Sequence, residues 1–390
     1  MLQNFRKLLL LSLFVLLFTG CARKYSSDAP LTPSYYPSIV IGSDNHVVYA
    51  IDPATGKKNW EFGVSGPIVA SPLLYKEIVY ICCANNDTVY KLNVQTGALI
   101  SKFVVTIGSG YNVTATPVAD GNLIYMTTSN GTIFAFDTGS GAIAWSFTAA
   151  APITSSPTVY NGYVYFGGMD GNVYCLDKTL GSAATTGNWT YTAVPTVPGY
   201  SVQFSSSPAM NDSLLFIGCN DSMVLSIYTT GTVAGTLKWA YKTKGAVNSS
   251  PTLYGGACIF GCADFHIYSI DIADDVPRWI DSANSDVNSS PFAYNNMIYI
   301  GSNDYNLYCV NAINGGLKWK FKSFGIIKSS PIAYNGVVYV GSYDKNLYAL
   351  DTATGSIKWQ YNINGQMECS PVIDNLTGTS YNSSISGAVQ

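Results

Sequence analysis

Charged side chains are scarce in this chain. Asp, Glu, Lys and Arg together make up 11% of its 390 residues, and there are only two histidines. The chain has no basic stripe or arginine cluster, which argues against nucleic acid as a partner. With so few histidines we expect neither a His-rich metal site nor a Ser-His-Asp arrangement. Cys-x-x-Cys-His does not occur, so a c-type haem is not expected. Beyond the N-terminal segment no stretch shows convincing helical periodicity, which leaves an all-β chain.

A repeated unit fills most of the chain. Tryptophan recurs at one place in this unit, at Trp60, Trp145, Trp189, Trp239, Trp279, Trp319 and Trp359, and an eighth slot holds Ser101. A small residue followed by proline recurs in step, at Ser71, Thr116, Ser156, Ser207, Ser250, Ser290, Ser330 and Ser370. In the last third the spacing is 40 residues, as from Ser290 to Ser330. Such a period indicates an array of identical supersecondary units.

Each repeat is predicted to form four short antiparallel strands, named A to D in chain order. In the clearest copy, Asn335-Gly336 is a strong hairpin signal because both central residues of such a turn take positive φ. Strands B, C and D of this copy are expected at residues 337–341, 346–351 and 356–361, where β-branched and aromatic residues alternate with polar ones. Four-stranded units of this length predict a β-propeller. A β-solenoid or a string of separate sheets is the alternative.

The two ends of the array complement each other. The first repeat begins at residues 38–43 with a strand of type B, and the last strand of type A, residues 369–373, has no B, C or D after it. Together they make one blade, which hides two sheet edges that a linear array would expose. We therefore predict one domain, residues 38–374, folded as an eight-bladed propeller, followed by a polar tail over residues 375–390.

A longer pattern covers strand C and the turn that follows it. Residues 50–60 (AIDPATGKKNW) and 349–359 (ALDTATGSIKW) share the form A-x-D-x-x-T-G-x-x-x-W. This form resembles the tryptophan-docking motif of the PQQ-type propeller repeats, a family that includes quinoprotein alcohol dehydrogenases and outer-membrane assembly lipoproteins of the BamB type. The resemblance covers nearly all of the repeat array. It is specific for the fold and weak for the function.

The resemblance implies that each indole is clamped between the alanine of its own motif and the glycine backbone of the neighbouring blade. Seven copies keep a small residue in the alanine slot, namely Ala50, Ala135, Cys175, Ser226, Ser269, Cys309 and Ala349. The eighth copy has Lys91 in that slot, and it is the copy with Ser101 in place of tryptophan. The ring and the space for it are lost together.

The N-terminus is predicted to be a processing signal. Arg6 and Lys7 precede an apolar run over residues 8–18 that is too short for a transmembrane helix, and Gly20-Cys21 follows. This junction resembles the bacterial lipoprotein box, so we expect residues 1–20 to be a signal peptide, Cys21 to carry lipid and residues 21–37 to form a tether. An ordinary signal peptide with an incidental cysteine is the alternative. Cleavage would leave 18 basic and 23 acidic residues, a net charge of −5.

The connections from strand D to the next strand A break the symmetry in two places. Most span 11 residues between the tryptophan slot and the next small-Pro pair, but one spans 15, from Ser101 to Thr116, and one spans 18, from Trp189 to Ser207. Exposed apolar loops suit a protein-binding surface. The candidate partner-binding residues are Ile107, Tyr111, Tyr191, Val194, Val197, Tyr200 and Phe204. The alternative is that these loops plug one mouth of the channel.

The sequence favours a non-catalytic, extracytoplasmic lipoprotein scaffold, with no cofactor and no metal predicted. The resemblance implies a BamB-like role in outer-membrane protein assembly, with envelope proteins and the barrel-assembly machinery as candidate partners. A PQQ- and calcium-dependent dehydrogenase and a surface glycan-binding module are the alternatives. In the quinoproteins PQQ stacks on a tryptophan floor, whereas all seven tryptophans here fall in docking slots. The adjacent Cys82 and Cys83 end a strand B, so they do not match the vicinal disulfide of those enzymes in position.

Overall fold

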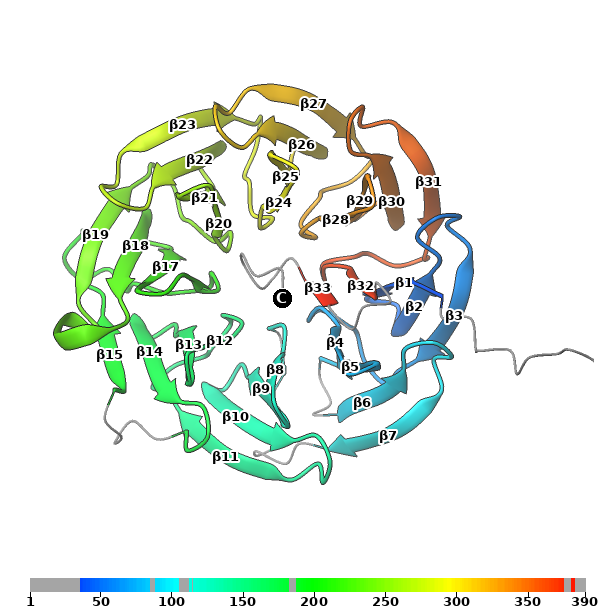
Figure 1. Ribbon diagram of the computed structural model, residues 1–390, viewed down its shortest axis with the longest axis horizontal. Coiled ribbons are helices and arrows are strands. Elements are labelled where there is room, and N and C mark those ends of the chain that lie inside the picture. The colour runs from blue at the N-terminus through cyan, green and yellow to red at the C-terminus, as the bar shows by residue number, and fades with distance from the viewer. Residues whose placement is uncertain are drawn as a thin grey trace, which may run out of the picture. The chain divides into compact units, whose positions relative to one another are not determined.

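Eight separate antiparallel sheets form the described part of the chain. The computed structural model describes residues 36–84, 88–104, 112–113, 115–181, 187–374 and 380–382. The sheets stand as radial blades around a common axis (Figure 1). This arrangement confirms the eight-bladed propeller predicted from the repeats. The expected signal peptide, Cys21 and nearly all of the expected tether lie outside the described residues.

Strands A and B form the inner half of each blade. The A strands contain two or three residues and are β32 (Val372–Asp374), β4 (Leu73–Tyr75), β8 (Val118–Asp120), β12 (Thr158–Tyr160), β16 (Ala209–Met210), β20 (Thr252–Tyr254), β24 (Phe292–Tyr294) and β28 (Ile332–Tyr334). The B strands are β1 (Ser38–Gly42), β5 (Ile78–Cys82), β9 (Leu123–Thr127), β13 (Tyr163–Gly167), β17 (Leu214–Cys219), β21 (Ala257–Gly261), β25 (Met297–Gly301) and β29 (Val337–Gly341). Blade 1 contains β1 and β32, and blades 2 to 8 follow in chain order.

Strands C and D form the outer half. The C strands are β2 (Val47–Ile51), β6 (Thr88–Asn93), β10 (Thr132–Asp137), β14 (Asn172–Asp177), β18 (Met223–Tyr228), β22 (His266–Asp271), β26 (Asn306–Asn311) and β30 (Asn346–Asp351). The D strands are β3 (Lys58–Gly63), β7 (Leu99–Val104), β11 (Ile143–Thr148), β15 (Trp189–Thr192), β19 (Leu237–Lys242), β23 (Pro277–Ser282), β27 (Leu317–Lys322) and β31 (Ile357–Asn362). A short 3₁₀ turn, η1 (Gly231–Val233), lies between β18 and β19.

The hydrophobic core lies between neighbouring blades. Strands B and C are buried almost throughout, because both faces of each sheet pack against the adjacent sheets. One cluster, for example, joins Ile259 and Ile267 of blade 6 to Ile298 and Val310 of blade 7. The core is therefore divided into repeated interfaces, and a ring can add blades without enlarging any one of them.

Blade 1 closes the ring. Strand β32 pairs antiparallel with β1, with Ile39 opposite Ile373 and Val40 opposite Val372. The sequence did not predict β33 (Ser380–Asn382), which pairs with the inner edge of β32 and makes blade 1 five-stranded. This strand lies within residues for which only a polar tail was expected.

A belt of hydrogen bonds links the blades near the axis. In each link the residue before proline donates its backbone N–H to the hydroxyl of the equivalent serine in the next blade. The distance is 2.9 Å from Ser370 to Ser71 and 3.1 Å from Ser250 to Ser290. Seven such links connect described residues, with donors Thr116, Ser156, Ser207, Ser250, Ser290, Ser330 and Ser370. The link from Ser370 joins the C-terminal strand to blade 2. The recurring serine is therefore a cross-blade acceptor as well as a repeat marker.

Candidate functional site

Each tryptophan ring packs against the turn between strands C and D of the following blade. The indole N–H of Trp60 donates to the Val94 carbonyl at 2.8 Å. A Cβ built on Gly97 would lie 2.6 Å from the Trp60 ring, so no larger residue fits there without movement. The same indole-to-carbonyl bond is made by Trp145, Trp239, Trp279, Trp319 and Trp359. The indole N–H of Trp189 has no hydrogen-bond partner among the described residues.

Blade 2 replaces the ring with a charge. Lys91 lies directly opposite Ser101 in the sheet, where the other blades have a small residue opposite tryptophan. Its ammonium group donates to the carbonyl of Thr138 at 2.7 Å, and Thr138 lies in the C–D turn of blade 3. The lysine thus supplies the donor that an indole supplies in six of the other blades.

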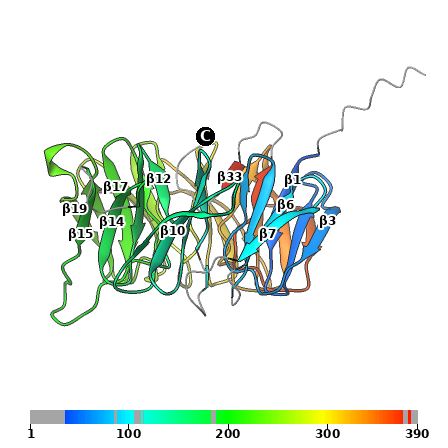
Figure 2. The same ribbon diagram turned by 90° about the horizontal axis from the view of Figure 1, so that it is seen from below.

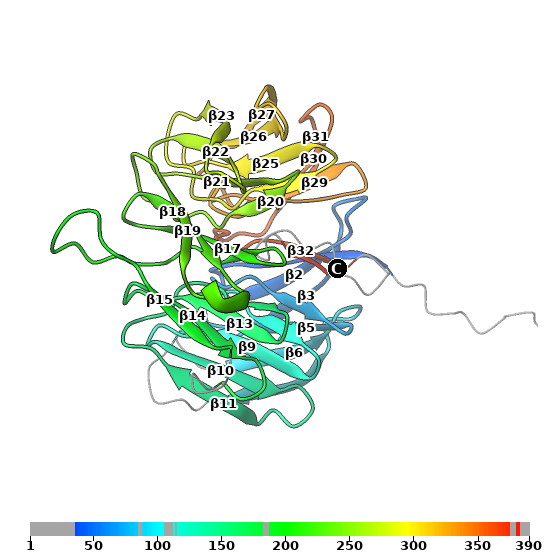
Figure 3. The same cartoon turned by 60° about the vertical axis from the view of Figure 1, so that its left-hand side comes forward.

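The long connection between blades 4 and 5 presents an apolar surface. Val194 is 78% exposed, Val197 58% and Tyr200 46%. The segment extends beyond the ring on the side away from η1 (Figures 2 and 3). These three side chains can be reached by a partner without unfolding any strand.

One predicted contact residue of this loop does not belong to that surface, and a second is only partly exposed. Phe204 is fully buried. A Cβ built on Gly167 would lie 2.4 Å from the Cβ of Phe204, so Phe204 occupies space that the glycine leaves free. Tyr191 lies in β15, half-buried against the same core cluster. Phe204 is therefore corrected from a candidate contact to a support of the loop, whereas Tyr191, which is partly exposed, stays a candidate contact. The other two candidates, Ile107 and Tyr111, lie outside the described residues.

Hydrogen bonds to blade 5 hold the loop in one conformation. The buried carboxylate of Asp221 accepts the Thr196 N–H at 2.6 Å and the Thr196 hydroxyl at 2.9 Å. Asn220 accepts the Gln203 N–H at 2.7 Å through its side chain and donates its own N–H to the Gln203 carbonyl. A loop fixed in this way loses little conformational entropy on binding.

Asp221 differs from its counterparts in the other blades. Asp170, Asp264, Asp304 and Asp344 each accept a hydrogen bond from the tyrosine four residues later and one from the preceding D–A connection. Four residues after Asp221 is Leu225, which has no hydroxyl group. The carboxylate is therefore available to the longer loop. An alignment of the repeats could have revealed this, because leucine replaces the tyrosine at this one position.

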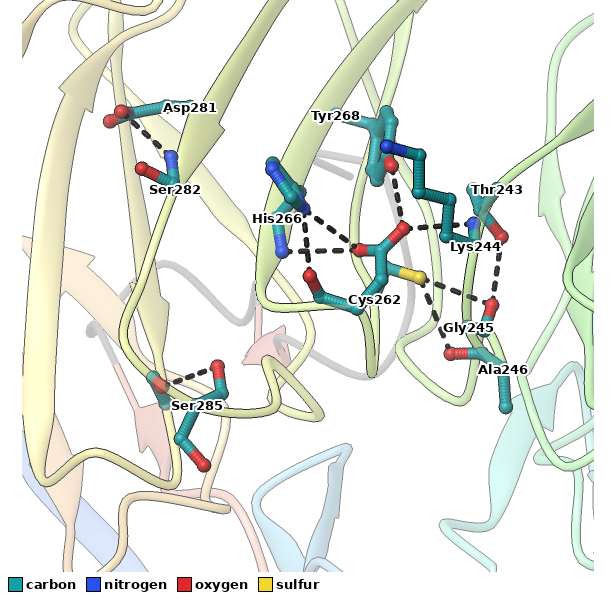
Figure 4. A network of polar contacts seen from close by, with 12 residues as sticks. Thr243, Lys244, Gly245, Ala246, Cys262, His266, Tyr268, Asp281, Ser282 and Ser285 are labelled. Carbon is teal, nitrogen blue, oxygen red and sulfur yellow. Dashed lines mark hydrogen bonds and ion pairs between the residues drawn. The ribbon is translucent and has the colours of Figure 1, made fainter.

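Cys262 and Asp264 lie in the B–C turn of blade 6, and His266 begins the strand β22 that follows it. Figure 4 shows Cys262 and His266 within one network of polar contacts. Nδ1 of His266 lies 3.3 Å from Oδ1 of Asp264, while the Cys262 thiol donates to the Gly245 carbonyl at 3.2 Å. Burial raises the pKa of the Cys262 thiol to about 12, so it stays protonated at neutral pH. Burial also raises the pKa of Asp264, but hydrogen bonds from Tyr268 and the Lys244 N–H outweigh it and hold that pKa below its ordinary value. These contacts stabilise the turn, and they do not make a nucleophile of the Cys262 thiol.

The eight cysteines after Cys21 are buried and unpaired. Burial raises the pKa of Cys83 to about 11 and that of Cys82 further. Among the described residues, no group of three or more His, Cys, Asp or Glu side chains could hold a metal ion. No helix among them is long and apolar enough to cross a membrane.

The family model for the outer membrane protein assembly factor BamB matches residues 26–100, 85–233 and 284–380. The chain belongs to the BamB family. A BamB of Taylorella asinigenitalis is 31% identical to it over 144 residues, which is 33% of this chain and 35% of that relative. The chain thus spans about a third of the length of that relative, so the relative's activity and partners do not transfer directly.

Solved structures share the fold. The crystal structure of BamB from Moraxella catarrhalis superposes with a TM-score of 0.66 at 17% identity, covering 78% of this chain and 90% of that one. A europium-containing methanol dehydrogenase superposes with the same TM-score, 0.66, at 14% identity, covering 82% of this chain and 83% of the enzyme. At these identities the likeness shows the propeller alone, so membership of the BamB family rests on the sequence match.

Proposed function

We propose that this protein is a non-catalytic scaffold of the bacterial cell envelope, with a BamB-like role in outer-membrane protein assembly. The observation that carries the proposal is the apolar loop tip formed by Val194, Val197 and Tyr200, held rigidly on blade 5 by Asp221. Membership of the BamB family supports it. The proposed partners are envelope proteins, the barrel-assembly machinery first among them.

The proposed anchor is a lipid on Cys21, which would hold the protein at the outer membrane. Tyr36 donates its N–H to Gln95, a residue of the C–D turn of blade 2. The C–D turns and the D–A connections lie at opposite ends of the antiparallel strands. The chain therefore enters the propeller on the face opposite the loop. A protein anchored upstream of Tyr36 would leave the loop tip free to meet its partner.

Replacing the loop tip is expected to weaken partner binding without changing the fold. The triple variant Val194→Ser, Val197→Ser, Tyr200→Ser removes exposed apolar contacts and keeps the anchors Thr196 and Phe204. A minority of interface residues, with tyrosine enriched among them, cost more than ~1 kcal/mol when truncated. With Tyr200 and two valines removed together, we expect Kd to rise at least about tenfold, which corresponds to ~1.4 kcal/mol. The measurement is titration by biolayer interferometry against the barrel-assembly complex, purified from the source bacterium without this chain.

The matched control is Val233→Ser. Val233 is 45% exposed, like Tyr200, but lies in η1 on the opposite face. Its substitution should leave Kd unchanged. Equal binding by the triple variant and the wild type, or equal loss in the control, would contradict the loop as the docking site.

Reconstitution with PQQ and calcium is expected to give no turnover of alcohols or sugars. Each of six indoles already donates its N–H to a neighbouring blade, and all seven rings lie between blades, so the residues present do not fit a stacking floor for the cofactor. A dye-linked dehydrogenase assay checks this expectation. PQQ-dependent reduction of the dye in the presence of an alcohol would favour the quinoprotein alternative instead.

A further inference from the structure

The turn between strands C and D of blade 7 carries an isoleucine that lies largely outside the core. Ile313 is 70% exposed, whereas blades 1, 6 and 8 have Ala54, Ala273 and Ala353 at the equivalent position. Leu317 begins β27 at the end of the same turn and is 52% exposed. One short hairpin, β26–β27, therefore presents two large aliphatic side chains to solvent.

Hydrogen bonds and packing hold this turn in one conformation. The side chain of Asn311 accepts the N–H of Ile313 at 2.9 Å. Trp279 of blade 6 donates its indole N–H to the Ala312 carbonyl at 3.0 Å, and its ring lies over Gly315. A surface that is already ordered loses little conformational entropy when it binds.

Strand β27 adds a row of basic side chains beside the turn. It is the outermost strand of blade 7 (Figure 1), and Lys318, Lys320 and Lys322 stand at alternate positions along it, all exposed. Among the described residues, no ion pair neutralises any of these three lysines. Residues 289–322 contain one acid, Asp304, which lies in the B–C turn at the opposite end of the blade. The outer edge of blade 7 is therefore positively charged.

Blade 7 also lacks the acid that begins the C–D turn in the blades beside it. In blades 6 and 8 this residue is Asp271 or Asp351, and each forms an ion pair with a base of its own strand D, Arg278 or Lys358. Blade 7 has Asn311 in its place, which accepts the hydrogen bonds of the turn without adding a negative charge. The lysines of β27 are therefore available to an external anion.

The chain enters the propeller on the face to which this turn belongs. Tyr36 contacts Gln95 in the C–D turn of blade 2, and all C–D turns lie at the same end of the antiparallel strands. Tyr36 lies 15 positions after Cys21, a stretch that spans at most about 54 Å when fully extended. A lipid on Cys21 would therefore keep this face within reach of the bilayer.

We propose that Ile313, Leu317, Lys318 and Lys320, named here the blade 7 corner, bind the surface of an anionic phospholipid bilayer. This inference rests on the lipid anchor of the proposed function and adds the orientation of the anchored ring. Exposed aliphatic side chains enter the headgroup region of a bilayer. A lysine close to an anionic membrane strengthens binding roughly fivefold. Small ligands bind in concave sites instead, which an exposed turn does not provide.

Lysine reactivity in the full-length lipidated protein tests this contact. The protein is bound to the outside of preformed vesicles, made either of equimolar phosphatidylcholine and phosphatidylglycerol or of phosphatidylcholine alone. The rate at which an acetylating reagent modifies each lysine is then followed by mass spectrometry. We expect Lys318 and Lys320 to react severalfold more slowly on the anionic vesicles. Lys345, exposed in the B–C turn of blade 8, should react equally on both, and equal rates at all three lysines would overturn the inference.

A pair of variants separates the blade 7 corner from overall charge. Energy transfer from tryptophan to dansyl-labelled headgroups reports how closely the ring approaches the bilayer. The corner variant Ile313→Ala, Lys318→Gln, Lys320→Gln should lose transfer on anionic vesicles, down to the level on phosphatidylcholine. The control Lys244→Gln, Lys345→Gln removes the same charge from exposed positions on the opposite face and should keep wild-type transfer. Both variants should keep the wild-type melting temperature, because all the replaced side chains are exposed.

Four other results would contradict the inference. Wild-type transfer in the folded corner variant would show that the corner does not touch the bilayer. Equal loss in both variants would assign the attraction to net charge. Weaker binding of the corner variant to the purified barrel-assembly complex, with transfer unchanged, would make the ligand a protein. A wild-type mass without lipid would remove the anchor. The loop-tip titration uses no bilayer, so the scaffold function can fail or stand independently of this contact.

Discussion

Ending the chain after Ser370 is expected to abolish cooperative folding. This truncation removes β32 and β33 and leaves the inner edge of β1 unpaired. It also removes Val372 and Ile373, both fully buried. Full burial of such a side chain is worth about 1.5–3 kcal/mol, and the backbone ladder is lost as well. The total approaches the 5–15 kcal/mol that separates typical folded and unfolded states.

Urea denaturation followed by tryptophan fluorescence measures this effect. The control is a chain that ends after Asp374, which loses β33 but keeps the pairing of β32 with β1. It should unfold in a single transition close to that of the full chain. A wild-type midpoint for the chain that ends at Ser370 would show that the ring does not need the C-terminal strand.

The function proposed above depends on this closure. The loop tip of Val194, Val197 and Tyr200 is rigid because Asp221 of blade 5 holds a connection that leaves blade 4. Two blades must therefore keep their relative position for one contact surface to exist. In a ring each blade is fixed by both neighbours, so loops on one face can diverge while the repeated interfaces provide the stability.

The repeated features could be predicted from the sequence because each one is present in several copies. The bounds expected for strands B and C of the clearest repeat agree with β29 and β30. Strand D begins one residue later than expected, at Ile357. Ser356 belongs to the turn, where its carbonyl accepts a hydrogen bond from the Asp351 N–H. The turn residues and the alternation of apolar and polar residues were sufficient to place these strands, because the neighbouring sheets impose the same environment in every copy.

The features that occur once could not be predicted in the same way. The aromatic side chain of Phe204 suggested an exposed contact, but this loop residue is buried against Gly167 of β13, where a Cβ would leave no room for it. The strand β33 is short and polar, and its pairing follows from a long-range neighbour rather than from propensity. The positive φ of Phe265 contradicts its residue type, so local preference predicts the wrong conformation.

Trp279→Ala is expected to cost about 3–5 kcal/mol of unfolding free energy, the range seen when a large buried aromatic residue is truncated. The ring is 8% exposed, packs over Gly315 and donates its N–H to the Ala312 carbonyl at 3.0 Å. Its removal opens a cavity between blades 6 and 7 and leaves that carbonyl without the indole donor. The free energy of unfolding is measured from urea titrations.

The chain contains a position-matched control for this substitution. Ser101 occupies the same place in blade 2, where Lys91 already supplies the donor to the next blade and no ring is present. Ser101→Ala should therefore change the free energy of unfolding by no more than about 0.5 kcal/mol, as surface substitutions usually do. A large difference between the two variants would show that the indole itself holds adjoining blades together. Similar small losses in both would mean that the sheets pack without it, and the repeated tryptophan would then need an explanation other than stability.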